Sequence, residues 1–483
     1  MAYSRFRVAH SQWSAALLLV KQNWAPIFLG LLMELGFLAW GLVTKTSSWG
    51  LLPLTFFSLF SLYAFVLFFA KRRLRGRAVL IVIVVFAIAF RLTLLFSQPI
   101  LSTDIYRYYW EGKVIANGFN PYLYSPDAPQ LTSLHDPIWI LLNLKYVRAS
   151  YPPFLELFFA LVYVVFRSVF GFKIVFFVLD LALIGGIYLI LRELNLNRTN
   201  VIVYAWAPLP IIEVAQTGHN DPLVMLLLFA SFLFFLRKKN AISAHVMALS
   251  VVSKFFSAFF APIFFKRWGK RSIMIFLATI VVFYAPLATM GFGLFNGLLF
   301  AINTVYFNGS IFPAIVNLLG SLSIFENVGF VTQIITYAIY TVVLLWAYFL
   351  PHNDADKSSF MKISFVLTGS LLLLNRAFFP WYVIWIVPFL AFFTSISWLL
   401  LSGTIFLGYM KYDSFPPPSF EAVDPQTRLL LDLAQYLPFY ILLAYELFKR
   451  KAVTRGSRGR LSPETRSKGS EALRGSSHWK ALS

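Results

Sequence analysis

The sequence predicts an all-α protein that crosses a membrane many times. Hydrophobic residues make up 59% of its 483 residues, charged residues only 13%, and the mean hydropathy is +0.73. A soluble domain carries about 25% charged residues, so much of this apolar material has to lie in lipid. The apolar segments are long runs rather than short alternating ones, which favours helices over the strands of a membrane barrel.

The predicted spans are apolar runs close to the ~20 residues that cross a bilayer. The clear ones are 25–43, 50–70, 78–97, 173–191, 200–216, 221–236, 272–290, 331–350, 360–376 and 428–448. Shorter or interrupted runs occupy 240–265 and 379–410. With these included, the sequence predicts roughly 12–14 crossings.

Clusters of Lys and Arg indicate the orientation, because short basic loops stay in the cytoplasm. They lie at 71–77, 237–239, 266–271 and 449–483, and they account for much of the net charge of +21 without implying nucleic acid. All fall inside if 153–170 is an interfacial or re-entrant helix.

This orientation divides the chain into a transmembrane domain and a tail. The domain covers 1–448, begins with an uncleaved first span, and carries a large first outer loop at 98–152. The two halves of 240–265 then meet near Lys254 on the outer side. We expect residues 449–483 to form a basic, disordered cytoplasmic tail, so that both termini lie inside.

The outer side then receives most of the polar and aromatic material, in 98–152, 217–221, 291–330, 375–382 and 411–427. The chain has no cysteine, which excludes disulfides and thiol chemistry. Its six histidines lack metal-ligand spacing, and no phosphate-binding glycine loop is present, which disfavours a nucleotide donor. We expect no resident metal, although the sequence leaves a divalent metal open.

The stretch DIYRYYWEGKVIANGFNPYLYSPDAP, residues 104–129, directly follows the third span. Asp104 should therefore lie near the outer bilayer surface, where a carboxylate can act as a general base. At helical spacing Arg107 and Glu111 share its face, and Tyr108 is placed to stack on a sugar. The alternative is that Asp104 caps this helix or pairs with Arg107.

A second polar element, GHNDP, stands at the outer start of a span. His219 and Asp221 are well placed there to bind a polar ligand. The alternative is that Asn220 or Asp221 is simply the N-cap of the helix that follows.

Three cations, Lys254, Arg376 and Arg91, lie in or at the membrane with few buried acids to pair them. A lysine in the middle of a hydrophobic segment costs ~2.5–3.5 kcal/mol on insertion scales, which suggests an anionic partner. Arginine can hold phosphate through a bidentate fork and lysine as a point charge. The alternative for Lys254 is snorkelling to the interface.

Taken in order, these segments resemble the GT-C superfamily of integral-membrane glycosyltransferases, especially bacterial polyprenyl-phosphate-mannose-dependent mannosyltransferases. The resemblance spans residues 100–390. Beside 104–129 it is carried by YPP at 151–153, YAWAPLPIIEVAQTGHNDPLV at 204–224, VSKFF at 252–256, YFNGSIF at 306–312 and FFPWYVIWIVPFL at 378–390.

The resemblance implies a GT-C-like helical bundle in the bacterial cytoplasmic membrane, with its active site on the outer face. It implies an inverting transfer of a sugar, mannose by this likeness, from a polyprenyl-phosphate donor to a glycan or lipid acceptor. The outer-loop base of the family maps onto Asp104, and Lys254, Arg376 and Arg91 become donor-phosphate ligands. The acceptor and sugar contacts would be Arg107, Tyr108, Glu111, His219, Asp221, Trp381 and Tyr382.

Two other functions compete with this reading. A secondary transporter or flippase can use intramembrane charges, but it usually carries inverted repeats, and the sequence shows no convincing internal repeat. A structural scaffold gives no reason for Lys254. Neither explains a 50-residue outer loop dense in aromatic residues, and we expect no cofactor beyond the lipid-linked co-substrate.

The orientation can be tested by adding single cysteines to this cysteine-free chain at Ser125 and Ser457. We expect an impermeant thiol reagent to label position 125 and not position 457 in intact cells. Labelling at 457 without labelling at 125 would overturn the topology.

Overall fold

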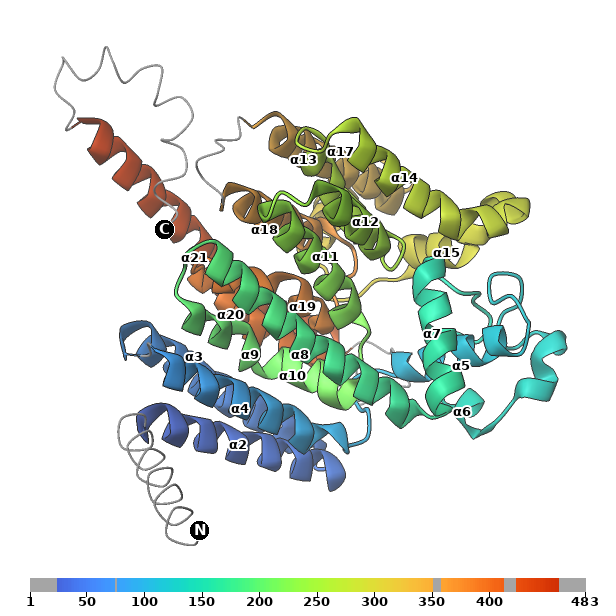
Figure 1. The fold of residues 1–483 in the computed structure, drawn as a ribbon, viewed down its shortest axis with the longest axis horizontal. Helices are drawn as coiled ribbons and strands as arrows, with labels where there is room; N and C mark the ends of the chain where they lie inside the picture. Colours follow the sequence, from blue (N-terminus) through green and yellow to red (C-terminus); the bar gives the residue numbers. More distant parts are fainter. Residues whose placement is uncertain (1–23, 74–75, 351–357, 412–422, 460–483) are drawn as a thin grey trace, which may run out of the picture.

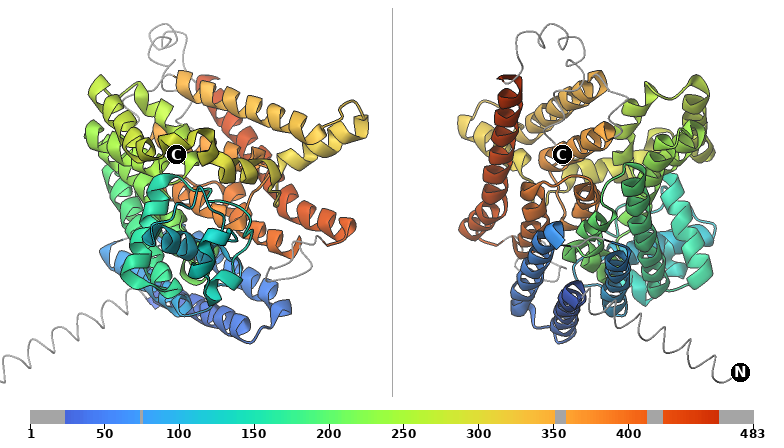
Figure 2. Two further views of the ribbon diagram at one scale, coloured as in Figure 1. Left: turned by 90° about the vertical axis from the view of Figure 1, so that its right-hand side faces the viewer. Right: turned by 60° about the vertical axis from the view of Figure 1, so that its left-hand side comes forward.

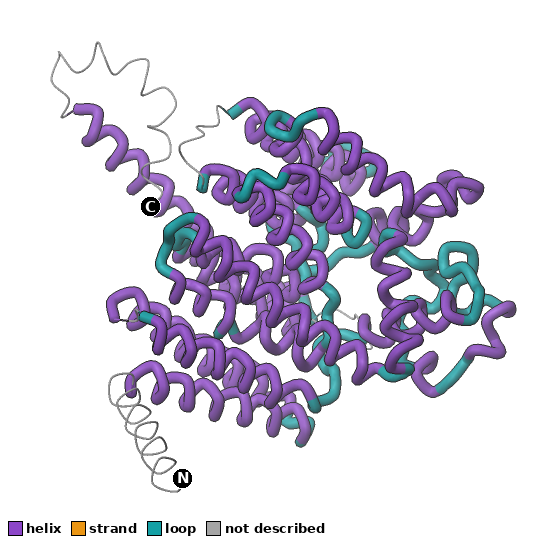
Figure 3. Tube along the Cα trace, viewed as in Figure 1, coloured by secondary structure: helices purple, strands orange, loops and turns teal. Residues whose placement is uncertain are grey.

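The computed structural model describes residues 24–73, 76–350, 358–411 and 423–459. Within these residues every regular element is helical, and no strand is formed (Figure 3). The amino terminus, the carboxyl end of the predicted tail, and parts of the 71–77 cluster and the 411–427 loop lie outside the described residues.

Helices of very different length build the molecule. The first half contains α2 (Trp24–Lys45), α3 (Leu52–Arg73), α4 (Arg77–Leu95), α5 (Asp104–Ala116), α6 (Pro137–Ile140), α7 (Pro153–Phe166), α8 (Val169–Glu193), α9 (Ile202–Ala205), α10 (Pro208–Ile211), α11 (Asp221–Leu236), α12 (Asn240–Val251) and α13 (Ala261–Phe265). The second half contains α14 (Lys270–Tyr284), α15 (Asn296–Thr304), α16 (Ile311–Leu322), α17 (Val328–Phe349), α18 (Ser359–Leu374), α19 (Val383–Ile386), α20 (Ile396–Thr404) and α21 (Pro425–Gly459).

The helices α2, α3 and α4 lie side by side along one edge of the bundle, and α5, α6 and α7 gather at one end (Figures 1 and 2). Between them, α8 to α11 form the centre of the molecule, where nearly every residue from 201 to 225 is buried. This end contains α5 and α6 from the predicted outer loop at 98–152 and α7 from the predicted interfacial helix at 153–170.

Six helical segments of the described chain are long and apolar enough to cross a membrane, and the chain is a polytopic helical membrane protein. They are Trp24–Lys45, Trp49–Phe68, Arg77–Leu95, Val169–Glu193, Lys270–Thr304 and Val328–Phe349. The helices at two other predicted spans, α11 and α18, have 16 residues each. The expected count of roughly 12–14 crossings is therefore not confirmed.

The predicted span 200–216 is wrong as a continuous helix. The chain breaks between α9 and α10 at Ala207 and continues through a π-helical turn at Ile212–Thr217. Pro208 and Pro210 cause the break, since proline has no amide hydrogen to donate and restricts the residue before it. Broken backbone is tolerated at this depth because the segment is buried in protein rather than exposed to lipid.

The predicted interruption in 240–265 is confirmed. The region 240–265 consists of α12 and a second short helical segment, Phe255–Phe265, and the two meet at Lys254. Helix α7 has only 14 residues and ends at Arg167, whose φ is +46°. Its interfacial or re-entrant position stays a prediction.

Helix α21 runs to Gly459, so the beginning of the predicted tail is helical.

A buried ion pair joins the helices at the centre of the bundle. Arg91 on α4 donates from Nε to Asp180 on α8 and from Nη1 to the carbonyl of Ala205, 2.8 Å away. The Tyr204 hydroxyl donates to the same carboxylate. The expectation that Arg91 lacks an acidic partner is wrong, which removes the argument for placing it in the donor site.

We expect Asp180→Ala to lower the free energy of unfolding by ~3–5 kcal/mol, because it leaves the buried Arg91 guanidinium without its counter-charge. Thermal or chemical unfolding of the purified protein in detergent measures this. The matched control is Glu193→Ala, since the partly exposed Glu193–Arg237 pair should contribute only ~0–1 kcal/mol. Equal losses in the two variants would contradict the central role of the buried pair.

Candidate active site

Helix α5 carries Asp104 in its first turn and is held in place by close packing on α7. A Cβ atom added at Gly112 of α5 would lie 2.4 Å from the carbonyl oxygen of Phe159 on α7, a distance that real side chains do not adopt. The absence of a side chain at Gly112 therefore allows the two helices to touch. This contact sets the position of Asp104 relative to the rest of the bundle.

The Asp104 carboxylate is half-buried and accepts a hydrogen bond from Asn143 Nδ2 at 3.2 Å. Burial raises the pKa of Asp104, the Asn143 hydrogen bond and the Lys254 charge lower it, and the Asp221 charge raises it. Asp104 neither caps α5 nor pairs with Arg107, the two alternatives considered above. The N-cap is Thr103, and Arg107 Nε donates to Glu111 instead.

The GHNDP turn brings a second carboxylate to the same place. Gly218 has a φ of +82°, and a Cβ there would lie 2.3 Å from the Ile105 side chain of α5. The turn therefore fits closely against the start of α5. Asn220 occupies the N-cap of α11 but makes no side-chain capping bond. Asp221, the next residue, points its carboxylate to Lys254.

Lys254 forms the centre of the cluster. Its ammonium donates to Asp221 Oδ1 at 2.6 Å, and Trp385 Nε1 donates to the same oxygen at 2.6 Å. The ammonium also lies 5.3–5.8 Å from the ring centroids of Tyr151, Tyr382 and Trp385, within cation–π range. The expectation that Lys254 lacks an acidic partner is therefore wrong, and its place in a donor site stays a prediction.

Buried polar atoms without partners accompany this pair. Asp221 Oδ2 and Asn220 Nδ2 are both buried, and neither has a hydrogen-bond partner within the described chain. Such atoms are rare in native proteins and usually mark a bound water, ion or ligand group. The two atoms lie beside the Lys254 ammonium, which also approaches Asn220 Oδ1 at 3.4 Å. The cluster therefore offers donors and acceptors to a ligand.

His219 and Trp381 connect the GHNDP turn to the segment that follows α18. Their rings stack at a centroid distance of 4.2 Å, and Trp381 stacks on Phe379 at 4.4 Å. Burial lowers the pKa of His219 to about 3, so its imidazole is neutral at physiological pH. Both residues are at least 90% buried. The stacking covers both rings, and their contact with sugar stays a prediction.

Arg376 stands at the start of that segment, with no contact to Lys254. Its guanidinium lies 3.7 Å from the centroid of the Tyr306 ring and donates from Nη1 to the carbonyl of Ile302 at 2.9 Å. Its Nε is buried without a hydrogen-bond partner, and no carboxylate of the described chain pairs with it. Arg376 is thus a buried cation whose Nε–H group could still donate a hydrogen bond.

Asn308, in the YFNGSIF motif, hydrogen-bonds to the chain segment that follows Arg376. Its φ is +49°, and its Nδ2 donates to the carbonyl of Phe378 at 3.3 Å. Its Oδ1 accepts from Lys411, and its own carbonyl accepts from the Tyr436 hydroxyl of α21 at 2.6 Å. The motif was found by resemblance alone, and its connecting role becomes visible only in three dimensions.

The remaining predicted sugar contacts lie elsewhere or are covered. Arg107 bonds to Glu111 at 2.6 Å and to the carbonyl of Leu144 at 3.2 Å, which ties α5 to the later part of the loop at 98–152. The Tyr108 ring is buried and stacks on Phe159 at 4.8 Å, so the structure does not support sugar stacking on it. Tyr382 does join the cluster, where it stacks on Trp385 at 4.0 Å.

Sequence reasoning missed Asn143, Tyr151 and Trp385 as site residues. Signals for two of them were present, since Tyr151 begins the YPP motif and Trp385 falls within the last quoted motif. Asn143 is an isolated polar residue in WILLNLKYV, and nothing in that spacing points to Asp104. The described residues contain no group of three or more His, Asp or Glu placed to hold a metal ion. Metal independence stays a prediction.

The helical bundle thus gathers carboxylates, a lysine and aromatic rings from distant segments, beside buried polar atoms that have no partner in the described chain. Residues 6–270, more than half of the chain, match the family model described as the N-terminal domain of alpha-(1->6)-mannopyranosyltransferase. The chain belongs to this family and is a mannosyltransferase, which favours the enzyme over the transporter and scaffold alternatives. A comparison with curated proteins finds no match.

Proposed function

We propose that the protein transfers mannose from a polyprenyl-phosphate donor to an acceptor hydroxyl, with inversion at the anomeric carbon and Asp104 as the general base. The observation that carries this proposal is the meeting of Asp104 with the Asp221–Lys254 pair, beside buried polar atoms that have no partner. The family name supports mannose as the sugar.

Two carboxylates compete for the role of base, and their partners favour Asp104. One oxygen of Asp221 already accepts from both the Lys254 ammonium and the Trp385 indole, so this carboxylate serves to hold three segments together. The Asp104 side chain accepts from the neutral groups of Asn143 and Ser102, and burial raises its pKa. It is therefore the better proton acceptor of the two.

The proposed reaction is a single displacement. The acceptor oxygen attacks the anomeric carbon as the bond from that carbon to the phosphate oxygen breaks. The acceptor proton passes to Asp104, and the donor leaves as polyprenyl phosphate. Lys254 and Arg376 would stabilise the negative charge that develops on the phosphate. Arg376 would do so by donating a hydrogen bond from Nε, which has no partner within the described chain.

The acceptor is proposed to be a sugar. The family name specifies an α-(1->6) linkage, which requires a 6-hydroxyl on the acceptor. The donor's prenyl tail would remain in the lipid bilayer, so an enzyme that uses this donor has to reach it within the membrane. We place the reaction on the outer face of the bacterial cytoplasmic membrane, because the basic loops at 237–239 and 266–271 are expected inside.

The general-base proposal predicts that Asp104→Asn lowers turnover by ~10²–10⁴ while donor binding persists, because the amide cannot accept the hydroxyl proton. Transfer of radiolabelled mannose from polyprenyl-phosphate mannose by purified protein measures this. The matched control is Asp127→Asn on the same loop, where the exposed carboxylate bonds only to Ser125 in this structure. Turnover near the wild-type rate in Asp104→Asn would exclude Asp104 as the base.

The phosphate-clamp proposal predicts that Arg376→Met raises the donor Kd roughly ten- to a hundredfold. The variant keeps the apolar stem on Tyr306 but loses a charge-assisted contact of ~1.5–3 kcal/mol. Arg148→Met is the control, since Arg148 is an exposed cation of the outer loop. Lys254→Met should raise the donor Kd by a similar factor. It should also lower the free energy of unfolding, because Asp221 loses its counter-charge. Unchanged donor KM in both variants would remove these residues from the donor site.

The Asn143 contact predicts a pH effect. Its hydrogen bond lowers the pKa of Asp104, so Asn143→Ala should raise that pKa. Because the base must be ionised, the acidic limb of the rate profile should move to higher pH and activity at low pH should fall. Asn117→Ala, at an exposed amide near the end of α5, should leave the limb in place. An unshifted limb in Asn143→Ala would show that Asp104 does not set it.

A further inference from the structure

Two buried carboxyl groups face each other where α5 packs on α7, outside the proposed catalytic cluster. Glu111 of α5 is 2% exposed and Glu156 of α7 is 1% exposed. Glu156 lies within hydrogen-bonding reach of Glu111. Glu111 Oε2 and both side-chain oxygens of Glu156 have no hydrogen-bond partner within the described chain. Burying three such oxygens at one point is unfavourable, and the proposed chemistry does not explain it.

The neighbouring cation cannot satisfy both carboxyl groups. Arg107 donates from Nε to Glu111 Oε1 at 2.6 Å. Its two terminal nitrogens donate to main-chain carbonyls of the loop at 98–152, those of Leu144 and Val147. All three nitrogens therefore have acceptors, and the single positive charge balances only one carboxylate. Helices α8 and α14 also pack on α7, and within the described residues neither adds a charge to those that act on Glu156.

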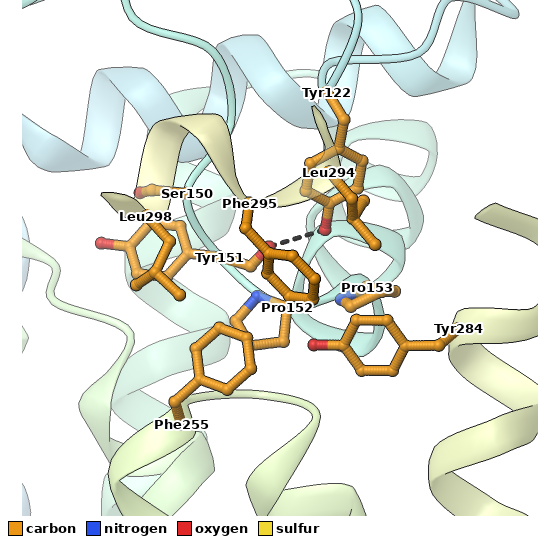
Figure 4. A pocket seen from close by; sticks show the side chains of 10 residues that line it. All are labelled: Tyr122, Ser150, Tyr151, Pro152, Pro153, Phe255, Tyr284, Leu294, Phe295 and Leu298. Carbon is orange, nitrogen blue, oxygen red and sulfur yellow. Dashed lines mark hydrogen bonds between the residues drawn. The ribbon is translucent and has the colours of Figure 1, made fainter. Parts of the chain in front are cut away.

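The nearby hydroxyls and solvent do not supply a donor either. The Tyr122 hydroxyl is close to both carboxyl groups but donates to the carbonyl of Tyr151 at 2.6 Å, the dashed line in Figure 4. Tyr122 also lines the cavity drawn there, whose volume of about 10 Å³ admits about one water and whose lining has no charged side chain. The Tyr284 hydroxyl lines the same cavity and bonds to no group of the described chain. A donor therefore has to come from the carboxyl pair itself.

One proton between the two carboxyl groups resolves this arrangement. A protonated Glu156 can donate to Glu111 Oε2, while Glu111 keeps its charge and its bond to Arg107, so that the three buried side chains are neutral together. Burial and the Glu111 charge raise the pKa of Glu156 well above its usual range, and the Arg107 charge lowers it. Two carboxyl groups that share a buried site cannot both ionise easily, because their like charges repel each other.

A series of contacts connects this pair to the proposed base. Glu111 fixes the Arg107 guanidinium, which holds the carbonyl of Leu144 at 3.2 Å. The residue before Leu144 is Asn143, whose amide donates to Asp104 at 3.2 Å. Without the shared proton, two adjacent negative charges would compete for Arg107. The loop would then lose the contact that holds Asn143 against Asp104.

We propose that Glu156 is a positioning residue for the reaction, and that it holds α5 and its base in place by donating a shared proton to Glu111. The inference rests on the proposed function and adds a group outside the reacting centre on which turnover depends. Glu156 itself contacts no substrate. When it ionises at alkaline pH, its proton passes to solvent, the hydrogen bond between α7 and α5 is lost, and turnover falls.

The direct test is Glu156→Gln, because the amide donates to Glu111 at every pH. In the mannosyl-transfer assay, wild-type turnover should fall about tenfold per pH unit above the ionisation of Glu156. Glu156→Gln should keep a turnover near the wild-type rate at neutral pH, and the alkaline fall should move to higher pH. The matched control is Glu326→Gln, at an exposed glutamate between α16 and α17, which should keep the wild-type profile.

A second variant, Glu156→Leu, has a side chain of similar size but no donor. It should lower turnover at neutral pH about tenfold with the donor KM unchanged, because Lys254 and Arg376 are untouched. If Glu156→Gln is as slow as Glu156→Leu, the charge of Glu156 is what turnover needs. If the alkaline fall is unshifted in Glu156→Gln, another group such as Lys254 sets it. Either result would overturn the proposal.

Infrared spectroscopy detects the proton without an activity assay. A protonated carboxyl group has a carbonyl stretching band that an ionised carboxylate lacks. The spectrum of the wild-type protein minus that of Glu156→Gln should therefore contain this band at neutral pH, and titration to alkaline pH should remove it. A difference spectrum without the band at neutral pH would exclude the shared proton.

The two kinds of measurement separate this inference from the proposed function. If the wild-type protein transfers no mannose while the infrared band is present, the proposed function fails and the shared proton stands. If transfer is normal and the band is absent, only the role of Glu156 fails.

Discussion

The ion pair between Asp221 and Lys254 is the interaction on which the site depends. One carboxylate oxygen joins the start of α11, the junction of two short helical segments and, through Trp385, helix α19. Charges this deep in a bundle are stable only when paired and hydrogen-bonded, so the three segments cannot be displaced independently. The aromatic rings around the ammonium cover much of the pair, and Tyr151 links it to the loop at 98–152. The pair thus fixes the geometry in which Asp104 and the donor would meet.

Close backbone contacts allow the segments to reach this arrangement. Gly112, Gly218 and Gly297 each stand where a side chain would collide with a neighbouring segment. The first brings α5 to α7, the second fits the GHNDP turn against α5, and the third brings α15 to the outer loop. Polar groups are therefore concentrated in a small volume that apolar helices surround, and the cost of burying them is offset by their mutual contacts.

The sequence predicted the class of fold, and it assigned the polar and aromatic segments to one face of the membrane because few such residues can lie in lipid. It could not predict how their charges are paired. Asp180 was visible within an apolar run, yet only the packing of α4 on α8 shows that it takes the charge of Arg91. The break at Ala207 was likewise signalled by two prolines, but hydropathy summed over the segment hid it. Roles such as those of Asn143 and Asn308 depend on tertiary contacts that no local spacing encodes.

The bond from Trp385 to Asp221 also has a consequence for how such proteins can evolve. Asp221 lies in the part of the chain that matches the family model, whereas Trp385 lies well beyond it. A lineage that replaces the indole loses a donor to a buried carboxylate and must supply another or change the acid itself. Drift in the carboxyl-terminal half is therefore constrained by chemistry housed in the amino-terminal half. Exchange of halves between homologues should succeed only where both inherit compatible residues at this junction.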